Sequence, residues 1–451
     1  MKIAILGTGY VGLITGVCLA KRGHKVVSVD INLDIVNRIN KCKAHIYEKN
    51  LNELLYEVIE SDNFYATNSL EKALDVSEAV IVAVGTPSQN GDIDLSFIKS
   101  VTRDLGQYMK DKRKPITVIV KSTVVPGTTD TVIRNILEKE SGYSLDKFGL
   151  GMNPEFLKEG SAIYDFMHPD RIIFGTEDEK SLFTLERLYK SWDCKKIIVN
   201  SRTAEFIKYT NNTILASQIS LSNELSLLAS KIGEIDFQKV LEGFQSDYRW
   251  SSKNKDGFNR PEILSYQIPG CGFGGSCFPK DIEAFTNLGV KKGLDMQMTR
   301  SILDVNSRQP YQVLQLIEQT YGPVKNKNIL LLGLAFKPET DDIRESASLK
   351  IIESMYGLNN KIIVHDPKAM INFKKYIGIN YPNLKTTSDW KIFLNEIDII
   401  IIATKWKEYE ELSELKTSAE LIFDCRRLLK KSQLKYSNYL TFGYNFKNNS
   451  K

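Results

Sequence analysis

A short apolar run followed by a glycine-rich turn restricts the fold of this chain more than any other feature. Residues 3–6 are hydrophobic and lead into Gly7-Thr8-Gly9-Tyr10-Val11-Gly12, after which apolar residues recur at helical spacing up to Gly23. A second apolar run, residues 25–29, ends at Asp30. A strand, a glycine turn, a helix and a second strand that ends in a carboxylate are typical of the βαβ unit that binds a dinucleotide.

The same stretch indicates which dinucleotide is bound. Glycines let the pyrophosphate approach the backbone closely, and the N-terminus of the following helix attracts its negative charge. Asp30 lies eighteen residues after Gly12, near the spacing of a carboxylate that binds the ribose 2′-hydroxyl. Because a carboxylate there repels a 2′-phosphate, we expect NAD. The expected contacts are Gly7, Gly9, Tyr10, Val11, Gly12 and Asp30.

The length of the chain requires more than one hydrophobic core, because 451 residues exceed what a single core supports. Apolar runs at 79–84, 116–120 and 172–174 extend the first sheet, and runs at 327–333, 361–367, 397–403 and 421–424 predict a second one. The second sheet lacks the glycine fingerprint, so we expect no second NAD there. We predict two Rossmann-like doubly wound α/β domains, over residues 1–200 and 311–451, joined by a central helical region over 201–310.

A long helix is predicted in the middle of the chain, from Ser201 to Lys231, with Gly233 as its end. About thirty residues of helix would span roughly 45 Å, enough to bridge two domains and to carry a partner subunit. Lys208 and Asn212 are four residues apart, so they share one face of this helix. A surface lysine beside a polar neighbour is the plainer interpretation of that pair.

A second glycine-rich stretch, residues 270–281, contains four glycines within six residues and then Cys277. Pro279 favours a helix start there, which would put the thiol at a helix N-terminus beside Lys280; both features lower the pKa of a thiol. Asp281 follows one turn later. A nucleophilic cysteine is useful when an aldehyde must be trapped and oxidised to an acid, and a dehydrogenase that transfers one hydride has no need of it. The plainer alternative is a buried cysteine in a glycine turn.

Two threonines and two glutamates complete the candidate residues. Thr86 and Thr123 follow predicted strands, so we expect them at the edge of the sheet where the cofactor binds. Glu155 and Glu159 are four residues apart and would share a face on a helix. Under one interpretation, one carboxylate positions a catalytic water and the other lies near the cofactor. Under the other interpretation, the two form a solvated acidic face.

Composition excludes several classes of protein. The net charge of +5 is small and dispersed, so we expect no nucleic-acid partner. Six cysteines without a CxxC pair favour a reduced, cytoplasmic protein, and four scattered histidines argue against a metal site. The apolar run at 397–403 is far too short to cross a membrane, and no signal peptide is expected because Lys2 leads directly into a strand.

Taken together, these motifs resemble the UDP-glucose/GDP-mannose dehydrogenase family, and most closely its UDP-glucose-oxidising group. The resemblance covers nearly the whole chain. It is carried by the following motifs: Gly7-Thr8-Gly9-Tyr10-Val11-Gly12, Lys121-Ser122-Thr123, Asn153-Pro154-Glu155-Phe156-Leu157, Lys208 with Asn212, residues 272–281, and Ala335-Phe336-Lys337. Members of this group oxidise the C6 alcohol of the sugar to a carboxylate with two NAD+ and one water. The product, UDP-glucuronate, commonly feeds polysaccharide and capsule synthesis.

The resemblance also implies a role for each matching residue. Lys208, Asn212 and Asp281 would hold a water and stabilise oxyanions at C6, and Cys277 would form a thiohemiacetal and then a thioester. Glu155 and Thr123 would position the water that hydrolyses this thioester. The expected cofactor contacts outside the glycine turn are Thr86, Thr123, Glu159 and Arg344. The expected nucleotide-sugar contacts are Glu155, Phe156, Leu157, Lys208, Asn212, Arg260, Tyr266, Gly274 and Lys337, and the glycines around Gly274 are expected to make room for the sugar diphosphate.

Two departures from the family pattern and three alternatives remain at this point. In the family, an arginine normally reaches into the partner's site of a homodimer, and Arg260 of this chain is shifted by one position from the place of that arginine. Five positions after the ribose-binding aspartate the family commonly has a basic residue, and this chain has Ile35 there. Gly-Gly-Ser-Cys is shared with GDP-mannose dehydrogenases, which are the main alternative. A dehydrogenase that transfers a single hydride and a non-catalytic NAD-binding protein are the others.

Overall fold

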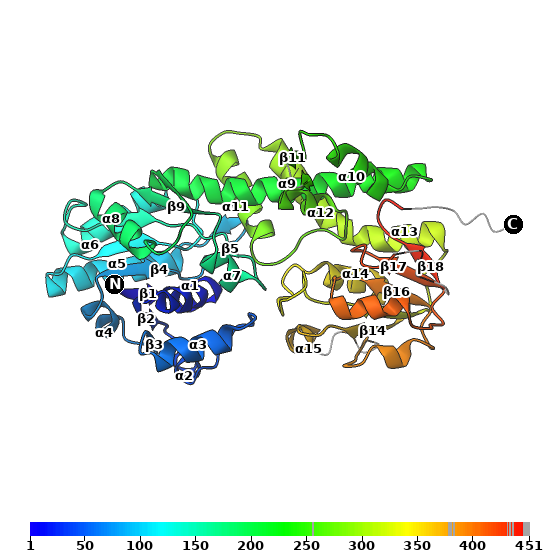
Figure 1. Cartoon of the computed structure of the whole chain (residues 1–451), viewed down its shortest axis with the longest axis horizontal. Coiled ribbons are helices and arrows are strands. Elements are labelled where there is room, and N and C mark those ends of the chain that lie inside the picture. Colours follow the sequence, from blue (N-terminus) through cyan, green and yellow to red (C-terminus); the bar gives the residue numbers. More distant parts are fainter. Residues whose placement is uncertain are drawn as a thin grey trace. The chain divides into compact units, whose positions relative to one another are not determined.

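The computed structural model describes residues 1–254, 257–377, 381, 384–430, 432, 434 and 437–444. The chain forms two compact units, Met1–Asn211 and Asn212–Lys451. The boundary between them falls within the longest helix, α9 (Ser201–Ile232), which is the long green helix in Figure 1. The prediction of one long helix in the middle of the chain is therefore confirmed.

Unit 1 is built on an eight-stranded sheet in the order β10-β9-β8-β7-β4-β1-β2-β3. Neighbouring strands are parallel except β8 and β9, which are antiparallel. The strands are β1 (Lys2–Leu6), β2 (Lys25–Val29), β3 (Phe64–Thr67), β4 (Ala79–Val82), β7 (Thr117–Val120), β8 (Leu150–Met152), β9 (Arg171–Thr176) and β10 (Lys195–Val199). In sequence, β2 and β3 extend the sheet on one side of β1, and β4 returns to its other side. The switch point between β1 and β4 is where such sheets bind ligands.

Helices cover both faces of this sheet. Side chains of a strand alternate between its faces, and β1 shows the result: Ile3 and Ile5 pack with α1 and α3, whereas Ala4 and Leu6 pack with α4 and α5. The helices of unit 1 are α1 (Tyr10–Lys21), α2 (Leu33–Asn40), α3 (Leu51–Glu60), α4 (Leu70–Asp75), α5 (Ser96–Lys112), α6 (Arg134–Ser141), α7 (Ala162–Met167) and α8 (Glu179–Leu188). A π-helix, η1 (Thr128–Ile133), leads into α6, and β5 (Ser88–Gln89) pairs with β6 (Asp92–Ile93).

Unit 2 contains a second sheet, six-stranded and parallel throughout, in the order β15-β14-β13-β16-β17-β18. Its strands are β13 (Asn328–Leu332), β14 (Lys361–His365), β15 (Leu384–Thr386), β16 (Ile399–Ile402), β17 (Leu421–Asp424) and β18 (Asn438–Leu440). The first four strands in sequence are arranged as β1 to β4 are in unit 1. The predicted fold class, two Rossmann-like α/β sheets with a long helix between them in sequence, is confirmed.

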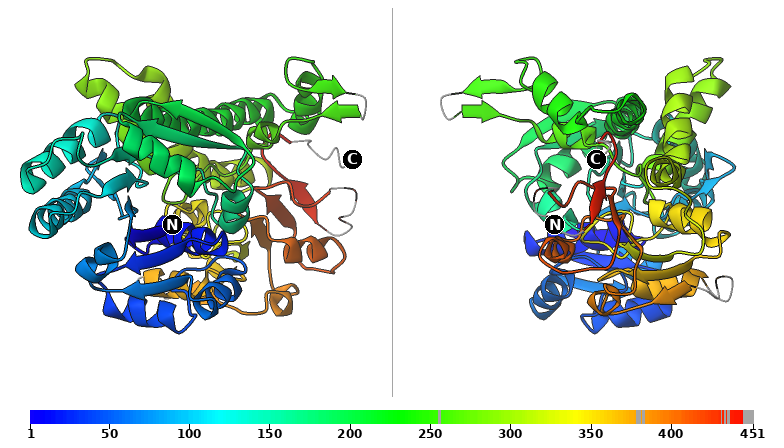
Figure 2. Two further views of the ribbon diagram at one scale, coloured as in Figure 1. Left: turned by 60° about the vertical axis from the view of Figure 1, so that its left-hand side comes forward. Right: turned by 90° about the vertical axis from the view of Figure 1, so that its right-hand side faces the viewer.

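The helices of unit 2 after α9 are α10 (Phe237–Gln245), α11 (Phe278–Lys291), α12 (Gln297–Arg308), α13 (Gln312–Thr320), α14 (Ala347–Tyr356) and α15 (Met370–Ile377). Shorter 3-10 helices are η2 (Glu262–Gln267), η3 (Gln309–Tyr311), η4 (Lys391–Phe393) and η5 (Lys407–Ser413). Residues 246–260 include a hairpin of β11 (Ser252–Asn254) and β12 (Gly257–Asn259). Figure 2 shows this hairpin extending away from the helices of its unit.

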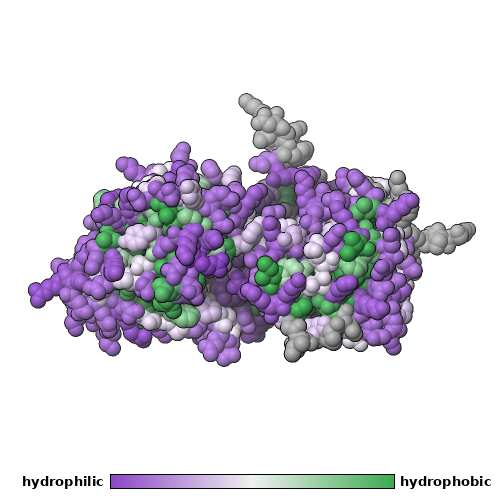
Figure 3. All heavy atoms as spheres, turned by 90° about the horizontal axis from the view of Figure 1, so that it is seen from below, coloured by the Kyte–Doolittle hydropathy of each residue, from purple (hydrophilic) through white to green (hydrophobic). Residues whose placement is uncertain are grey.

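The surface seen in Figure 3 is mostly hydrophilic, and its hydrophobic residues form small separate patches. Among the helices in the described part of the chain, none is both long enough and apolar enough to cross a bilayer.

Candidate active site

The glycine turn after β1 has the shape that a bound pyrophosphate requires. A Cβ at Gly12 would lie 1.9 Å from the carbonyl oxygen of Gly7, so only glycine fits at this close approach. Gly9 is exposed and precedes the first turn of α1. The carboxylate of Asp30 accepts the backbone N–H groups of Thr8 at 3.1 Å and Asn32 at 2.9 Å and remains partly exposed. These residues fit an NAD molecule whose ribose binds Asp30 and whose pyrophosphate lies at the helix N-terminus.

Tyr10 and Val11, which we expected to contact the cofactor, begin α1 and are partly buried. The hydroxyl of Tyr10 donates to the carboxylate of Glu48, which also accepts the backbone N–H of Gly160 at 2.7 Å. Sequence reasoning did not single out Glu48. It ties the start of α1 to the segment that carries Glu159.

Thr86 and Thr123 lie together although 37 positions separate them in the sequence. The Thr86 hydroxyl donates to the backbone carbonyl of Thr123 at 2.9 Å. Their loops follow the neighbouring strands β4 and β7, whose carboxyl ends meet at the same edge of the sheet. Both threonines are therefore on the side of the sheet where the glycine turn lies.

Glu155 and Glu159 would share a face only on a helix, and Glu155 does not lie on one. Residues 153–158 have no regular structure, and α7 begins only at Ala162. Glu155 is instead a buried partner of Lys208, whose ammonium lies 2.8 Å from its Oε1. Its Oε2 accepts the N–H of Leu157 at 2.6 Å. This backbone contact, rather than helical spacing, fixes the orientation of the carboxylate.

The environment of Glu155 keeps it ionised. Burial opposes the charge, but Lys208, the Leu157 N–H and Lys121 outweigh burial and hold the pKa of this carboxyl below its ordinary value. The ring of Phe156 lies 5.5 Å from the Lys208 ammonium and 4.3 Å from the Arg171 guanidinium. The ammonium is thus held between a carboxylate and an aromatic face.

Glu205 is a buried carboxylate that the sequence analysis missed. It lies on α9 three residues before Lys208, and it accepts the backbone N–H groups of Gly127 at 2.6 Å and Thr129 at 2.8 Å. Burial raises the pKa of Glu205 to about 7, with a smaller contribution from Asp130. These bonds join the first turns of α9 to the loop that follows Thr123, so they help to place Lys208. The only sign of Glu205 in the sequence was its position in the first turns of a predicted helix.

In unit 2, Cys277 stands immediately before α11 with an exposed side chain. Pro279 occupies the first turn of α11, as the sequence predicts. Asp281 is buried one turn further on and accepts the side-chain N–H of Asn212 at 2.8 Å, while the Lys280 ammonium lies 2.6 Å from its other oxygen. The structure therefore brings together two predicted site residues, Asn212 and Asp281, that are 69 positions apart.

The glycines before Cys277 have a structural reason that the sequence did not reveal. Gly275 has φ +80°, and a Cβ there would lie 2.8 Å from the ring of Phe336. Its N–H donates to the carbonyl of Arg344 at 2.9 Å. A Cβ at Gly274 would lie 2.2 Å from the carbonyl oxygen of Glu345. Residues 336–345 are packed against this turn, which explains the glycines without any need for a bound sugar.

The other predicted ligand contacts of unit 2 remain predictions. Arg260 is exposed just after β12, and Tyr266 is partly buried in η2. Lys337 lies beside the ring of Phe336, with 5.5 Å between its ammonium and the ring centroid. The Arg344 guanidinium is exposed and paired with Asp342 at 2.7 Å.

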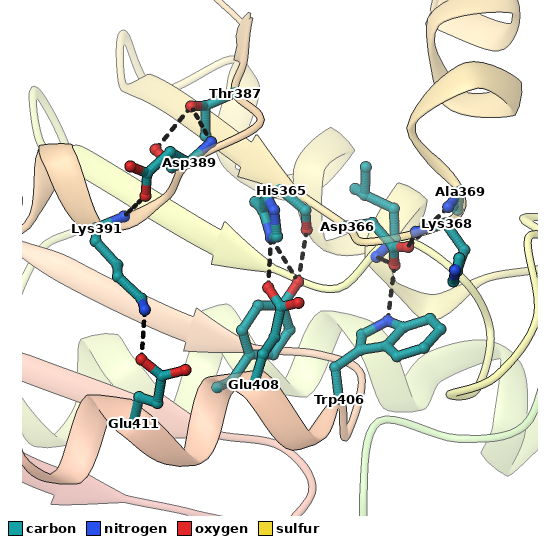
Figure 4. Close-up of polar contacts among 12 residues, drawn as sticks. His365, Asp366, Lys368, Ala369, Thr387, Asp389, Lys391, Trp406, Glu408 and Glu411 are labelled. Atoms are coloured by element: carbon teal, nitrogen blue, oxygen red, sulfur yellow. Dashed lines mark hydrogen bonds and ion pairs between the residues drawn. The ribbon is translucent and has the colours of Figure 1, made fainter.

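The aspartate at the end of β14 differs from Asp30 in its surroundings. Asp366 stands there as Asp30 stands after β2, but its side chain is only 3% exposed. Figure 4 shows it among its partners. Its oxygens accept hydrogen bonds of 2.7 to 3.0 Å from the backbone of Leu334, Ala335, Lys368 and Ala369 and from the indole of Trp406. Because this carboxylate is buried, it is not available to a ribose, whereas Asp30 is partly exposed.

The turn after β1 and the partly exposed Asp30 fit the binding site of an NAD-binding protein. Within the described residues, no group of three or more His, Cys, Asp or Glu side chains is placed to hold a metal ion. Residues 1–193, 202–308 and 330–431 match the NAD-binding, central and UDP-binding domains of the UDP-glucose/GDP-mannose dehydrogenase family. The chain belongs to this family and is a nucleotide-sugar dehydrogenase, so the resemblance seen in the sequence is confirmed.

Individual relatives agree along nearly the whole chain. A UDP-glucose 6-dehydrogenase of Haloferax volcanii is 34% identical over 438 residues, which cover 95% of this chain and 97% of that protein. A GDP-mannose 6-dehydrogenase of Pseudomonas syringae pv. tomato is 32% identical over 433 residues, covering 94% and 95%. The solved structure of a UDP-glucose dehydrogenase from Pyrobaculum islandicum superposes with a TM-score of 0.88 and 36% identity, covering 98% and 97%.

Proposed function

We propose that this protein oxidises UDP-glucose to UDP-glucuronate, with two NAD+ and one water consumed for each sugar. The observation that carries the proposal is the exposed thiol of Cys277 at the start of α11, one turn before the buried Asp281. A thiol in that position suits the capture of an aldehyde. The match of residues 330–431 to a UDP-binding domain supports a uridine nucleotide as the carrier of the sugar.

In the first oxidation, the C6 alcohol of the sugar becomes an aldehyde. NAD+, when bound at the glycine turn, accepts the hydride lost from C6 in each of the two oxidations. Lys208 is proposed to stabilise the negative charge that develops on the C6 oxygen, because it is a buried cation paired with the Glu155 carboxylate. Asn212 and Asp281 are proposed to hold a water molecule that also stabilises this charge, since they form a buried donor and acceptor pair.

Cys277 then bonds to the aldehyde carbon and gives a thiohemiacetal. Loss of a second hydride from C6 converts this adduct to a thioester, which has no route back to the free aldehyde. Water cleaves the thioester, the carboxylate leaves, and the thiol is regenerated. Glu155 and Thr123 are proposed to position this water. The ionised carboxylate of Glu155 can accept a proton from it. The overall change is one alcohol, two NAD+ and one water to one carboxylate, two NADH and three protons.

We propose that residues of both units of the chain contact the sugar nucleotide. Phe156 and Leu157 flank the Glu155 carboxylate, and they are proposed to contact the sugar. Tyr266, the Gly274 backbone and Lys337 are proposed to contact the nucleotide, with Lys337 on a phosphate. Arg260 is proposed to act in the partner's site. Glu159 and Arg344 are proposed to contact NAD.

The test is the yield of NADH from a limiting amount of sugar nucleotide, followed by absorbance. We expect two NADH per UDP-glucose and little turnover of GDP-mannose. Two NADH per GDP-mannose with little from UDP-glucose would assign the chain to the other branch of its family. One NADH per sugar would contradict the thioester route, and NAD binding without turnover of either nucleotide would indicate a non-catalytic protein.

We further propose that the protein acts as a homodimer through α9. Leu221, Leu225, Leu228 and Ile232 recur at spacings of four, three and four residues and are 46 to 66% exposed. Such a stripe on a helix is typical of a face that packs against another helix. A second copy of the chain is the expected occupant because the family pattern places a partner's arginine in each site.

Sedimentation equilibrium should therefore give twice the mass of one chain. The double variant Leu225→Glu/Leu228→Glu should sediment as a monomer, because it buries two unpaired charges in the dimer interface. Leu294→Glu is the matched control, since Leu294 is 61% exposed but lies outside α9. A wild-type mass of one chain at working concentration would refute the dimer.

We place the reaction in the cytoplasm. All six cysteines are free, and several free thiols without a disulfide are typical of proteins in a reducing compartment.

A further inference from the structure

Glu48 is a buried carboxylate that joins the start of α1 to the segment before α7. It lies between α2 and α3 and is only 6% exposed. Its Oε2 accepts a hydrogen bond from the Tyr10 hydroxyl. The same oxygen accepts the backbone N–H of Gly160 at 2.7 Å, and Oε1 accepts that of Ala162 at 2.9 Å. Each of these donors is neutral, so directed hydrogen bonds compensate the burial of this charge.

The segment of residues 153–161 needs an anchor of this kind. Residues in it form neither helix nor strand, so their backbone N–H groups must find other partners. At its beginning, the N–H of Asn153 donates to the carbonyl of Val120 at 2.8 Å. At its end, Glu48 accepts the N–H of Gly160, whose φ of +84° favours glycine, and that of the first residue of α7. Glu48 therefore fixes the end of the segment that carries the site glutamates.

The same carboxylate holds the first turn of α1. Gly9, directly before α1, has no side chain that could cap the helix. Burial, with the nearby Glu48 charge, raises the pKa of Tyr10, so that its hydroxyl stays protonated and able to donate at neutral pH. The N–H groups in the first turn of such a helix are the ones that bind a pyrophosphate. A shift of Tyr10 would therefore alter the cofactor site.

Only a carboxylate can accept all of these hydrogen bonds. A glutamine has one acceptor oxygen, and its NH2 group would face a backbone N–H that also donates. Ala162 and Phe166 share a hydrophobic core with residues of α1, which brings α7 close to that helix. Apolar contacts are not directional, however, whereas hydrogen bonds fix distance and angle. The identity of the residue as glutamate therefore matters for the exact position of both segments.

We propose that Glu48 is a positioning residue that holds the first turn of α1 and the segment of Glu155 and Glu159 in one fixed arrangement. The part that concerns NAD binding depends on the glycine turn alone. The part that concerns catalysis rests on the proposed function, because it acts through the site glutamates. Loss of the carboxylate should therefore change two separate quantities, the affinity for NAD and the value of kcat with saturating substrates.

The test compares the full-length wild type with Glu48→Gln, Tyr10→Phe and the double variant. Fluorescence titration measures the Kd for NAD without any sugar, and steady-state assays at saturating NAD measure kcat and KM for the nucleotide sugar. Thermal unfolding followed by circular dichroism shows whether each variant is folded at the assay temperature. Glu53→Gln is the matched control, because Glu53 lies five residues later in α3 with an exposed side chain.

Glu48→Gln should raise the Kd for NAD by about tenfold, the equivalent of one hydrogen bond to a charged group. It should also lower kcat by about a hundredfold, because small displacements of reacting groups are costly. Tyr10→Phe keeps the bonds from the segment before α7, so it should weaken NAD binding and leave kcat nearly unchanged. The double variant should bind NAD no more weakly than Glu48→Gln, since both changes break the same link. Glu53→Gln should match wild type.

A Glu48→Gln protein that unfolds at a lower temperature but keeps the wild-type Kd and kcat would overturn the proposal, because Glu48 would then only stabilise the fold. Tighter NAD binding would overturn it too, since the charge would merely repel the pyrophosphate. Effects of the two substitutions on the Kd that multiply in the double variant would also contradict the link. If Glu48→Gln does not fold, Tyr10→Phe decides the question, and a wild-type Kd in that variant would refute the link.

Failure of the proposed function gives a different result. Wild type would then bind NAD but turn over no nucleotide sugar, and the catalytic part of the inference would fall with it. The NAD titrations need no sugar, so they still confirm or refute the part that concerns the cofactor.

Discussion

Replacing Cys277 by serine is expected to lower formation of the sugar acid by about three orders of magnitude or more, as removal of a covalent nucleophile does in other enzymes. A serine hydroxyl is a far weaker nucleophile than a thiolate at neutral pH, so the aldehyde is no longer trapped. The side chain is exposed at the start of α11, and the exchange of sulfur for oxygen leaves the fold intact. Chromatography of the products measures the acid, and fluorescence titration measures NAD affinity, which should not change.

The matched control is Ser276→Ala. Ser276 is the adjacent residue, and its hydroxyl forms a hydrogen bond of 3.7 Å with the Cys277 sulfur, so this variant removes a neighbouring contact but keeps the thiol itself. It should keep most of the wild-type rate. If Cys277→Ser forms the acid as quickly as wild type does, the thioester route is wrong.

Replacing Lys208 by methionine is expected to destabilise the protein by about 3 kcal/mol or more and to abolish turnover. The substitution leaves the buried Glu155 carboxylate without the partner that lies 2.8 Å away, and an uncompensated buried charge costs several kcal/mol. Lys121 still acts on that carboxylate, so the cost falls toward the lower end of the range. Urea unfolding at neutral pH measures the free energy of unfolding.

The double variant Lys208→Met/Glu155→Gln separates stability from catalysis. With both charges removed, the free energy of unfolding should recover most of the loss, while turnover should stay absent. Lys239→Met is the control for a surface pair, since Lys239 and Glu242 lie 2.9 Å apart with 73% and 43% of their side chains exposed. It should leave the free energy of unfolding nearly unchanged. A Lys208→Met protein as stable as wild type would show that the buried pair does not stabilise the fold.

The parts of the fold that could be predicted from the sequence are those that local patterns determine. The turn from Gly7 to Gly12 and the helix start after Cys277 each depend on a few neighbouring residues, and both predictions of local structure agree with the structure. α9 was predictable because its apolar residues recur over nine turns of helix. The conformation around Glu155 could not be predicted, because spacing alone carries no information about the backbone that holds the side chain.

The contacts that the sequence could not reveal join residues far apart in the chain. Glu155 and Lys208 are 53 positions apart, and Glu205 and Gly127 are 78 apart. Glu48 could not be singled out, because its burial and its hydrogen-bond partners arise only when distant segments meet. The burial of Asp366 and its hydrogen bonds to the backbone of Leu334 and Lys368 are likewise visible only in the folded chain.

The contact between Phe336 and the glycine turn limits how the enzyme can be redesigned. Any side chain added at Gly274 would displace the Glu345 backbone, and one added at Gly275 would displace the Phe336 ring. Either change would shift the turn that carries the thiol, so a pocket reshaped by substitution at these glycines would have its nucleophile displaced as well. An engineer who wants to change the accepted sugar should leave this turn untouched and begin with side chains that do not support it.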